Sequence, residues 1–262
     1  MSGAPVLASQ VRNVLRSRWI AAYAVMLFLA AALLIRFGGG GERALLSLVN
    51  VVLALVPLVT VVFGTLYVYH AREFIELLLT QPIGRGGLYL ALFGGLALPL
   101  SAAFLLGIGA PLAVAAVQEP GIGRPLATLL AVGVLLTLVF TALALLVAVT
   151  IEDRAKGLGA ALMVWLACTA LYDGVILLVI TAFRDYPLEL PTLILTALNP
   201  IDLARVTLLL TFDVAALMGY TGAVFERAFG GGLGLALAVT LLLASAAIPF
   251  AAGLYWFRRR DL

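Results

Sequence analysis

The sequence is poor in the side chains that usually carry catalytic or metal chemistry. Its 262 residues include one histidine, His70, one cysteine, Cys168, and one lysine, Lys156. One histidine excludes a histidine metal cluster within a single chain, and one cysteine excludes an intramolecular disulfide. Lys156 stands before Gly157, and no Walker A loop, HExxH motif or Gly-x-Ser-x-Gly motif occurs. We therefore expect a non-catalytic protein that binds no metal and no cofactor of its own.

Charged residues are equally scarce. They make up 11% of the chain against 64% hydrophobic residues, and the net charge is +3. Soluble domains of this length do not have such a composition. The basic residues flank apolar runs and form no patch, so we expect membrane lipid and not nucleic acid as a partner. The apolar runs are continuous and do not alternate with polar residues, which favours helices over a β-barrel. We predict an all-α polytopic membrane protein.

Six apolar runs are long enough to cross a bilayer, which takes about 20 helical residues. The third run exceeds that length, and Pro99 and Pro111, together with Gly107 and Gly109, can kink it. We expect one transmembrane domain over residues 1–262. Its six transmembrane helices are predicted at 19–35, 45–69, 88–117, 126–151, 158–183 and 233–257.

The distribution of basic residues predicts the orientation. Placing the N-terminus inside puts ten of the 16 lysines and arginines on the inner side and six on the outer side. The three arginines at 258–260 are the strongest anchor. We therefore expect a multi-pass protein of the bacterial inner membrane with both termini in the cytoplasm. Residues 6–18 form an amphipathic pattern, which predicts an interfacial helix in the headgroup layer or, alternatively, a solvated basic terminus.

The region 184–232 contains another apolar run, 206–225, interrupted by Asp213. A seventh span here would place the arginines at 258–260 outside, so we reject it on charge grounds. Asn199 can cap a helix, Pro200 suits its first position, and Asp202 lies near its positive end. We expect an external subdomain of short helices, interfacial or re-entrant, between the fifth and sixth spans. Asp202 and Arg205, three residues apart, can pair with each other.

The segment 70–87, between the second and third spans, differs from an ordinary loop. Arg72, Glu73 and Glu76 provide a charged start, and the block Leu77-Leu78-Leu79 is more apolar than a free loop needs. Pro82 then ends the helical pattern. A short helix of this kind can dock into a cleft on another protein, or it can lie on its own bundle. We prefer docking.

Two further groups of polar residues lie within predicted spans. Asp173, near the middle of the fifth span, is costly in a bilayer and is either a pathway or gating residue or a hydrogen-bonded structural contact. An aspartyl protease would need a second deep carboxylate, which is absent. On the second span, Asn50, Thr60 and Tyr67 share a small or polar stripe with Pro57 and Gly64. Tight helix packing explains this stripe best, and a pathway between two subunits is the alternative.

Several of these features resemble one transporter class. Six spans, an amphipathic N-terminal segment and a charged segment ending in Pro82-x-x-Arg85 are similar to ABC-2 (type V exporter-like) permeases. Blocks 72–83, 198–205 and 216–225 further resemble NosY-type permeases, the membrane subunits of an ABC system that matures nitrous oxide reductase. The resemblance implies that the segment 70–87 couples to an ATPase. The residues it assigns to that contact are Arg72, Glu73, Glu76, Leu77, Leu78, Gln81, Pro82 and Arg85.

The same resemblance implies partners for the chain. Two copies pair with two cytoplasmic ATPase subunits of the NosF type, which hold ATP and Mg²⁺, and with a periplasmic β-helical protein of the NosD type. The system serves assembly of the copper–sulfide centre of nitrous oxide reductase. The absence of a Met, Cys or His ladder argues against a copper channel, which leaves a sulfur species or a mechanical relay. We expect contact with the periplasmic partner at Asn199, Pro200, Asp202, Arg205 and Asp213.

Two other functions fit the same sequence. One is an ABC-2 exporter of another substrate, such as haem, lipid or a drug. The other, from a different class, is a stand-alone channel or membrane scaffold. An ATPase that copurifies with the chain would favour either ABC transporter function over a stand-alone channel or scaffold.

Overall fold

The computed structural model describes residues 10, 11, 14, 17–38, 41–79, 84–119, 121–183, 189–212 and 231–259, and all regular structure among them is helical. Six helices are long and apolar enough to cross a membrane, which confirms the predicted number and class. They are α2 (Arg18–Phe37), α3 (Gly41–His70), the continuous α5–η1–α6 helix (Arg85–Gln118), α7 (Gly123–Thr150), the α8–η2–α9 helix (Arg154–Ala182) and α13 (Gly231–Arg259).

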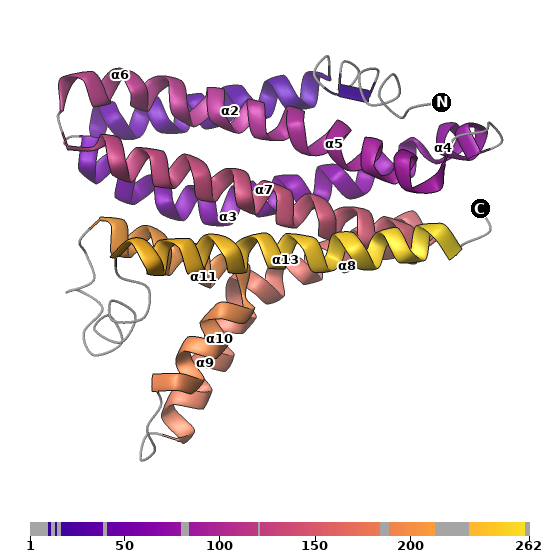
Figure 1. Ribbon diagram of the computed structural model, residues 1–262. Coiled ribbons are helices and arrows are strands. Elements are labelled where there is room, and N and C mark those ends of the chain that lie inside the picture. The colour runs from indigo at the N-terminus through magenta and orange to yellow at the C-terminus, as the bar shows by residue number, and fades with distance from the viewer. Residues whose placement is uncertain are drawn as a thin grey trace.

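Helix α7 lies at the centre of the bundle. In its most apolar 18-residue window, 72% of the residues are buried, against 50% in α3 and 33% or less in the other spans. It packs against α3 and α13, and also against α5 and α11 (Figure 1). A helix that is apolar on all sides is expected inside a bundle and not on its surface. The core around it includes Leu129, Leu136 and Phe140, all fully buried.

The third span changes its helical geometry near its middle. It runs as an α-helix to Phe104, forms a π-helical turn, η1 (Leu105–Gly109), and continues as α6 (Ala110–Gln118). Pro111 has no backbone N–H, so the ordinary bond to the carbonyl of Gly107 cannot form and the turn widens. At Gly107 a Cβ atom would lie 2.8 Å from the Ala24 carbonyl oxygen. The glycine therefore lets α2 approach this turn closely.

Gly133 on α7 provides a second close approach. A Cβ atom there would overlap the ring of Phe104, which is fully buried on α5. Because aromatic rings bury large areas, the contact between this ring and the bare backbone of Gly133 sets the distance between the two helices.

The fifth span is the least covered by the rest of the chain. It comprises α8 (Arg154–Leu166), the π-helical turn η2 (Ala167–Leu171) and α9 (Tyr172–Ala182), and none of its most apolar window is buried. Helix α9, together with α10 (Glu189–Leu198), projects away from the bundle (Figure 1). The long exposed face of this span can be covered only by lipid or by another protein.

Helix α11 (Pro200–Thr211) returns from this projection into the bundle. It bends by 110° relative to the preceding helix, and the two form an apolar pair that resembles a broken span or a re-entrant loop. Ile201, Ala204 and Leu208 join the main core, while Leu203 and Val206 pack with α13. The predicted external subdomain over 184–232 therefore includes a helix, α11, that packs into the core of the bundle.

The two ends of the bundle are held by polar contacts. At one end lie α4 (Arg72–Leu79), the turn between α7 and α8, and the end of α13 (Figure 1). At the other end, the Glu119 carboxylate accepts bonds from the backbone N–H of Gly41, at 2.9 and 3.1 Å. The predicted amphipathic helix over 6–18 lies mostly outside the described residues, although Gln10 and Val14 within it are buried.

Candidate functional site

Helix α4 presents two different faces. Ile75 and Leu78, three residues apart, are buried against the bundle in a cluster with Tyr89 and Phe257. Phe74 and Leu77 face outward, with 46% and 59% of their surface exposed. Since residues three or four apart share one side of a helix, the buried pair fixes the orientation and the other pair is left for an outside contact.

Two arginines near α4 connect it to the rest of this end of the bundle. Arg72 donates from Nη1 to the backbone carbonyl of Glu152 at 2.9 Å, which ties the helix to the turn between α7 and α8. Arg85 donates to the carbonyl of Arg258, also at 2.9 Å, which ties the start of α5 to the end of α13. Arg72 thus links α4 to the turn between α7 and α8, and Arg85 links α5 to α13.

The structure divides the predicted coupling residues into groups. Glu73, Glu76 and Leu77 are exposed on α4, and Arg72 and Arg85 are half-buried and bonded to backbone carbonyls. Leu78 packs into the bundle with only 7% exposure, so it holds α4 in place and does not face a partner. Gln81 and Pro82 lie outside the described residues. Phe74, which was not among the predicted coupling residues, belongs to the exposed face.

A polar cluster of four residues, Asp173, Asn199, Asp202 and Arg205, joins α9 to α11. Arg205 donates from Nη1 to both carboxylate oxygens of Asp173 at 3.0 Å, and to Asp202 Oδ1 at 3.1 Å. Asn199 donates from Nδ2 to the other oxygen of Asp202 at 2.8 Å. The sequence had assigned Asp173 to a pathway and the other three to a partner contact, and the structure brings them together.

Asn199 has two roles at the bend between α10 and α11. Its side-chain oxygen accepts from the backbone N–H of Ile201, so it is the N-cap that the sequence predicted, followed by Pro200 in the first turn. Its amide nitrogen donates to the backbone carbonyl of Cys168 at 2.7 Å. Cys168 lies in η2, and a π-helical turn shifts the backbone bonds so that a carbonyl can accept an outside donor.

The charges in the polar cluster do not balance, since two carboxylates face one guanidinium. Their exposure differs: the Asp202 side chain is 6% exposed, Arg205 33% and Asp173 45%. A buried carboxylate needs its hydrogen-bond donors within the chain, whereas a half-exposed one can also take partners from outside the chain. The cluster is therefore anchored at Asp202 and open at Asp173. Asp213, the remaining predicted contact residue, lies outside the described residues.

The predicted stripe on α3 does not form a continuous polar path in this chain. Asn50 is exposed, whereas Thr60 is fully buried and its hydroxyl has no partner among the described residues. Tyr67 donates its hydroxyl to the side-chain oxygen of the buried Gln10. At Gly64 a Cβ atom would lie 2.8 Å from the Cβ of Ala144 on α7. Close packing of α3 on α7 explains this glycine.

No group of three or more His, Cys, Asp or Glu side chains that could hold a metal ion occurs in the described part of the chain.

The sequence did not predict two of the contacts within the fold. One is the bond between Gln10 and Tyr67. The other is the bond from the Tyr172 hydroxyl to the Leu195 carbonyl, 2.7 Å long, which ties α9 to α10. Neither has a local signal, because each bond joins segments far apart in the sequence.

Comparison with known proteins decides the family. No protein-family model matches the chain. A protein of Pseudomonas aeruginosa named "Probable ABC transporter permease protein NosY" is 31% identical in an alignment 280 positions long, which covers 98% of each chain. The chain belongs to the NosY family of ABC transporter permeases. A second protein with the same name, from Stutzerimonas stutzeri, is 29% identical over 79% of this chain and 81% of its own.

Membership in the NosY family agrees with the six spans of the fold. The chain is a multi-pass membrane protein and a permease subunit of an ABC transporter. Permeases of such transporters generally work as pairs with an ATPase partner. The exposed face of α4 and the polar cluster are two places on the described chain where such a subunit could contact a partner.

Proposed function

We propose that this permease couples ATP hydrolysis in a separate subunit to assembly of the copper–sulfide centre of nitrous oxide reductase. The observation that carries the proposal is similarity along 98% of the chain to a NosY protein, together with an α4 helix that packs on the bundle with one face and exposes the other. The chain itself is non-catalytic, and ATP and Mg²⁺ bind to the partner.

The ATPase, of the NosF type, docks on the exposed face of α4. Phe74 and Leu77 supply apolar contacts, and Glu73 and Glu76 surround them with charge, as at the rim of an ordinary protein interface. Motion of α4 reaches the start of α8 through the bond from Arg72 to the Glu152 carbonyl. It reaches α5 and α13 through the packing of Ile75 and Leu78 against Tyr89 and Phe257.

A second copy of the chain covers the fifth span. This span has no buried residue in its apolar window, and it exposes Met163, Leu171, Leu177 and Leu178. A symmetric pair would bury the same face on both copies. Asp173, at the open side of the polar cluster, then lies close to the shared interface.

The polar cluster and the projecting helices α9 and α10 carry the motion to a periplasmic partner of the NosD type. Asn199, Asp202 and Arg205 fix α11 to the π-helical turn of the fifth span, so movement of that span displaces α11. The sequence has no ladder of Met, Cys or His residues of the kind that copper paths use. We therefore propose transport of a sulfur species or mechanical signalling as the output, in preference to copper conduction.

This scheme requires a defined orientation in the bacterial inner membrane. Helix α4, the turn between α7 and α8, and the end of α13 lie together at one end, which we assign to the cytoplasm with both chain termini. The other end, where Gly41 bonds to Glu119, faces the periplasm.

Two measurements test the proposal. The ATPase should copurify with the chain in mild detergent, and the exposed-face variant Leu77→Asp should lose it. In cells, loss of the permease should give reductase that lacks its copper–sulfide centre, measured from its absorption spectrum. If the ATPase copurifies with the chain but the reductase of cells without the permease has a normal centre, the chain would instead belong to an exporter of another substrate.

A further inference from the structure

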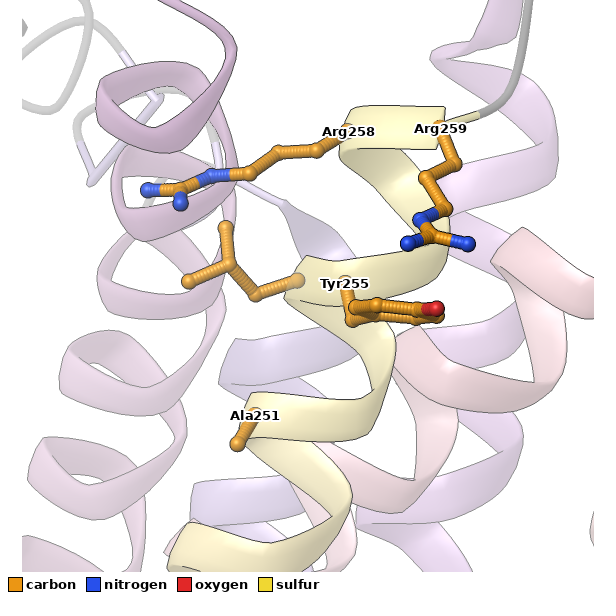
Figure 2. A pocket seen from close by; sticks show the side chains of 5 residues that line it. Ala251, Tyr255, Arg258 and Arg259 are labelled. Carbon is orange, nitrogen blue, oxygen red and sulfur yellow. The ribbon is translucent and has the colours of Figure 1, made fainter.

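A groove at the end of α13 has the chemistry of a lipid headgroup site. It is a cavity of about 270 Å³ lined by Ala251, Leu254, Tyr255, Arg258 and Arg259 (Figure 2). The first four of these residues follow the spacing of one helix face. The groove is thus apolar toward the middle of the membrane span and basic at its end, which is the order of groups in a phospholipid.

The two arginines lie against other parts of the fold. The Arg259 guanidinium lies 4.2 Å from the centre of the Tyr255 ring, and Figure 2 shows it above that ring. Arg258 extends to α5, where a Cβ atom at Gly86 would lie 2.7 Å from its Nη2. Within the described part of the chain, no carboxylate forms an ion pair with either guanidinium. Among the described residues, both positive charges are therefore available for an anion.

The position of the groove places it at the membrane surface. Helix α13 is apolar from Gly234 onward, and its arginines occupy the last turn. Tyr255 and Trp256, 51% and 53% exposed, lie directly before them. Aromatic side chains followed by arginines mark the headgroup layer of a bilayer. Arg85, bonded to the Arg258 carbonyl, adds a third positive charge close by.

We propose that this groove binds an anionic phospholipid, with its phosphate between Arg258 and Arg259 and an acyl chain along Ala251 and Leu254. Arginine suits this role because its planar guanidinium forms paired hydrogen bonds with phosphate oxygens. A bound lipid then bridges the end of α13 and the start of α5, at the same end of the bundle as α4. The site is independent of the proposed role in reductase assembly.

Native mass spectrometry of the full chain in mild detergent tests the site. The chain is titrated with dioleoylphosphatidylglycerol, dioleoylphosphatidylcholine or inorganic phosphate. We expect a saturable adduct with phosphatidylglycerol, weakened roughly fivefold by Arg258→Gln or Arg259→Gln and about 25-fold by both, as expected for loss of one surface arginine contact each. The double Lys variant keeps the charge but loses the paired hydrogen bonds, so it should bind more tightly than the double Gln variant and less tightly than the unchanged chain.

Two arginines outside the groove serve as matched controls. Arg154→Gln, at the start of α8, and Arg36→Gln, in the last turn of α2, should leave binding unchanged. Equal binding of phosphatidylcholine, or unchanged binding by the double Gln variant with a normal elution profile, would overturn the proposal. Inorganic phosphate that binds as tightly as the lipid would indicate a free-anion site and would also overturn it.

Discussion

Arg205 donates from a single nitrogen to both carboxylate oxygens of Asp173, at 3.0 Å each, although the two residues lie 32 positions apart on different helices. This contact closes the polar cluster over the bend between α10 and α11. Asp173 is 45% exposed, whereas Asp202, the other partner of Arg205, is 6% exposed. The two ion pairs of Arg205 should therefore contribute very differently to stability.

Asp173→Asn and Arg205→Gln should differ strongly in thermal stability. The first removes the half-exposed partner of Arg205, which keeps its bond to Asp202, and should cost about 0.6–1.7 kcal/mol, as for hydrogen bonds between membrane helices. The second leaves the buried Asp202 carboxylate with Asn199 as its remaining side-chain donor and should cost about 2–3 kcal/mol, near the low end for a broken buried pair because Arg205 is partly exposed. Unfolding followed by size-exclusion chromatography after heating measures both.

The control for this comparison removes the stranded charge. Asp202→Asn combined with Arg205→Gln should recover at least half of the stability lost by Arg205→Gln alone, because no buried carboxylate then lacks its partner. Equal losses for Asp173→Asn and Arg205→Gln would contradict the assignment of Asp202 as the anchor.

Leu77→Asp should release the ATPase while the bundle remains folded. Leu77 is 59% exposed on α4, so a charge there disturbs only an outside contact. We expect at least tenfold weaker association in a pull-down from mild detergent, in line with loss of a central contact residue. Phe37→Asp, at the exposed end of α2 on the opposite side of the bundle, should keep the ATPase.

Leu78→Asp is unsuitable as a docking test, although the sequence pointed to Leu78 as a contact residue. The side chain is buried beside Tyr89 and Phe257, and a carboxylate there would destabilise the bundle itself. Full retention of the ATPase by Leu77→Asp would refute docking on the exposed face of α4.

Gly133→Ala should destabilise the bundle by about 1–3 kcal/mol, the usual cost of overpacking a core. The added methyl group meets the ring of Phe104, which cannot move freely because it is fully buried. Phe104→Leu in the same chain should restore part of the loss. Gly159→Ala on α8, where a Cβ would meet nothing within 4 Å, should be neutral or stabilising by up to about 1 kcal/mol. Similar melting temperatures for Gly133→Ala and Gly159→Ala would disprove the close contact.

Cysteines on the fifth span should cross-link two copies of the chain. In a Cys168→Ser background, we expect oxidation to join copies through at least one of the single replacements Met163→Cys, Leu171→Cys or Val175→Cys, all on exposed positions of the fifth span. A disulfide requires Cα atoms within about 7 Å, so only residues near a two-fold axis react. Val25→Cys and Phe28→Cys on α2 should stay uncrosslinked on non-reducing gels. Cross-linking on α2 alone would move the interface there.

The six spans were predictable because each is one continuous apolar run, and a bilayer leaves few other structures for such a run. The start of α11 was predictable for a similar local reason, since Asn199 and Pro200 together form a strong helix start. The exposure of individual residues in Leu77-Leu78-Leu79 was not predictable. Three identical residues carry no periodicity, so only packing against Tyr89 and Phe257 distinguishes the buried Leu78 from the exposed Leu77.

The polar cluster was beyond sequence reasoning for a different reason. Asp202 and Arg205 could be paired from their spacing, and that bond is present at 3.1 Å. The approach of Asp173 depends on the π-helical turn before it and on the 110° bend after α10, and neither of these has a sequence signal strong enough to fix a distance. From the sequence alone, Asp173 was therefore interpreted separately from Asn199, Asp202 and Arg205.

The bond between Tyr172 and the carbonyl of Leu195 joins α9 to α10 near the point where this projecting arm of two helices meets the bundle. Both ends of this arm attach to the bundle at neighbouring points, through η2 on one side and Asn199 on the other, and Asn199 bonds Cys168 across the gap. The arm consequently has one fulcrum and not two. A small tilt at the fulcrum becomes a larger sweep at the tip, so the geometry converts a helix adjustment inside the membrane into a displacement at a distance from it.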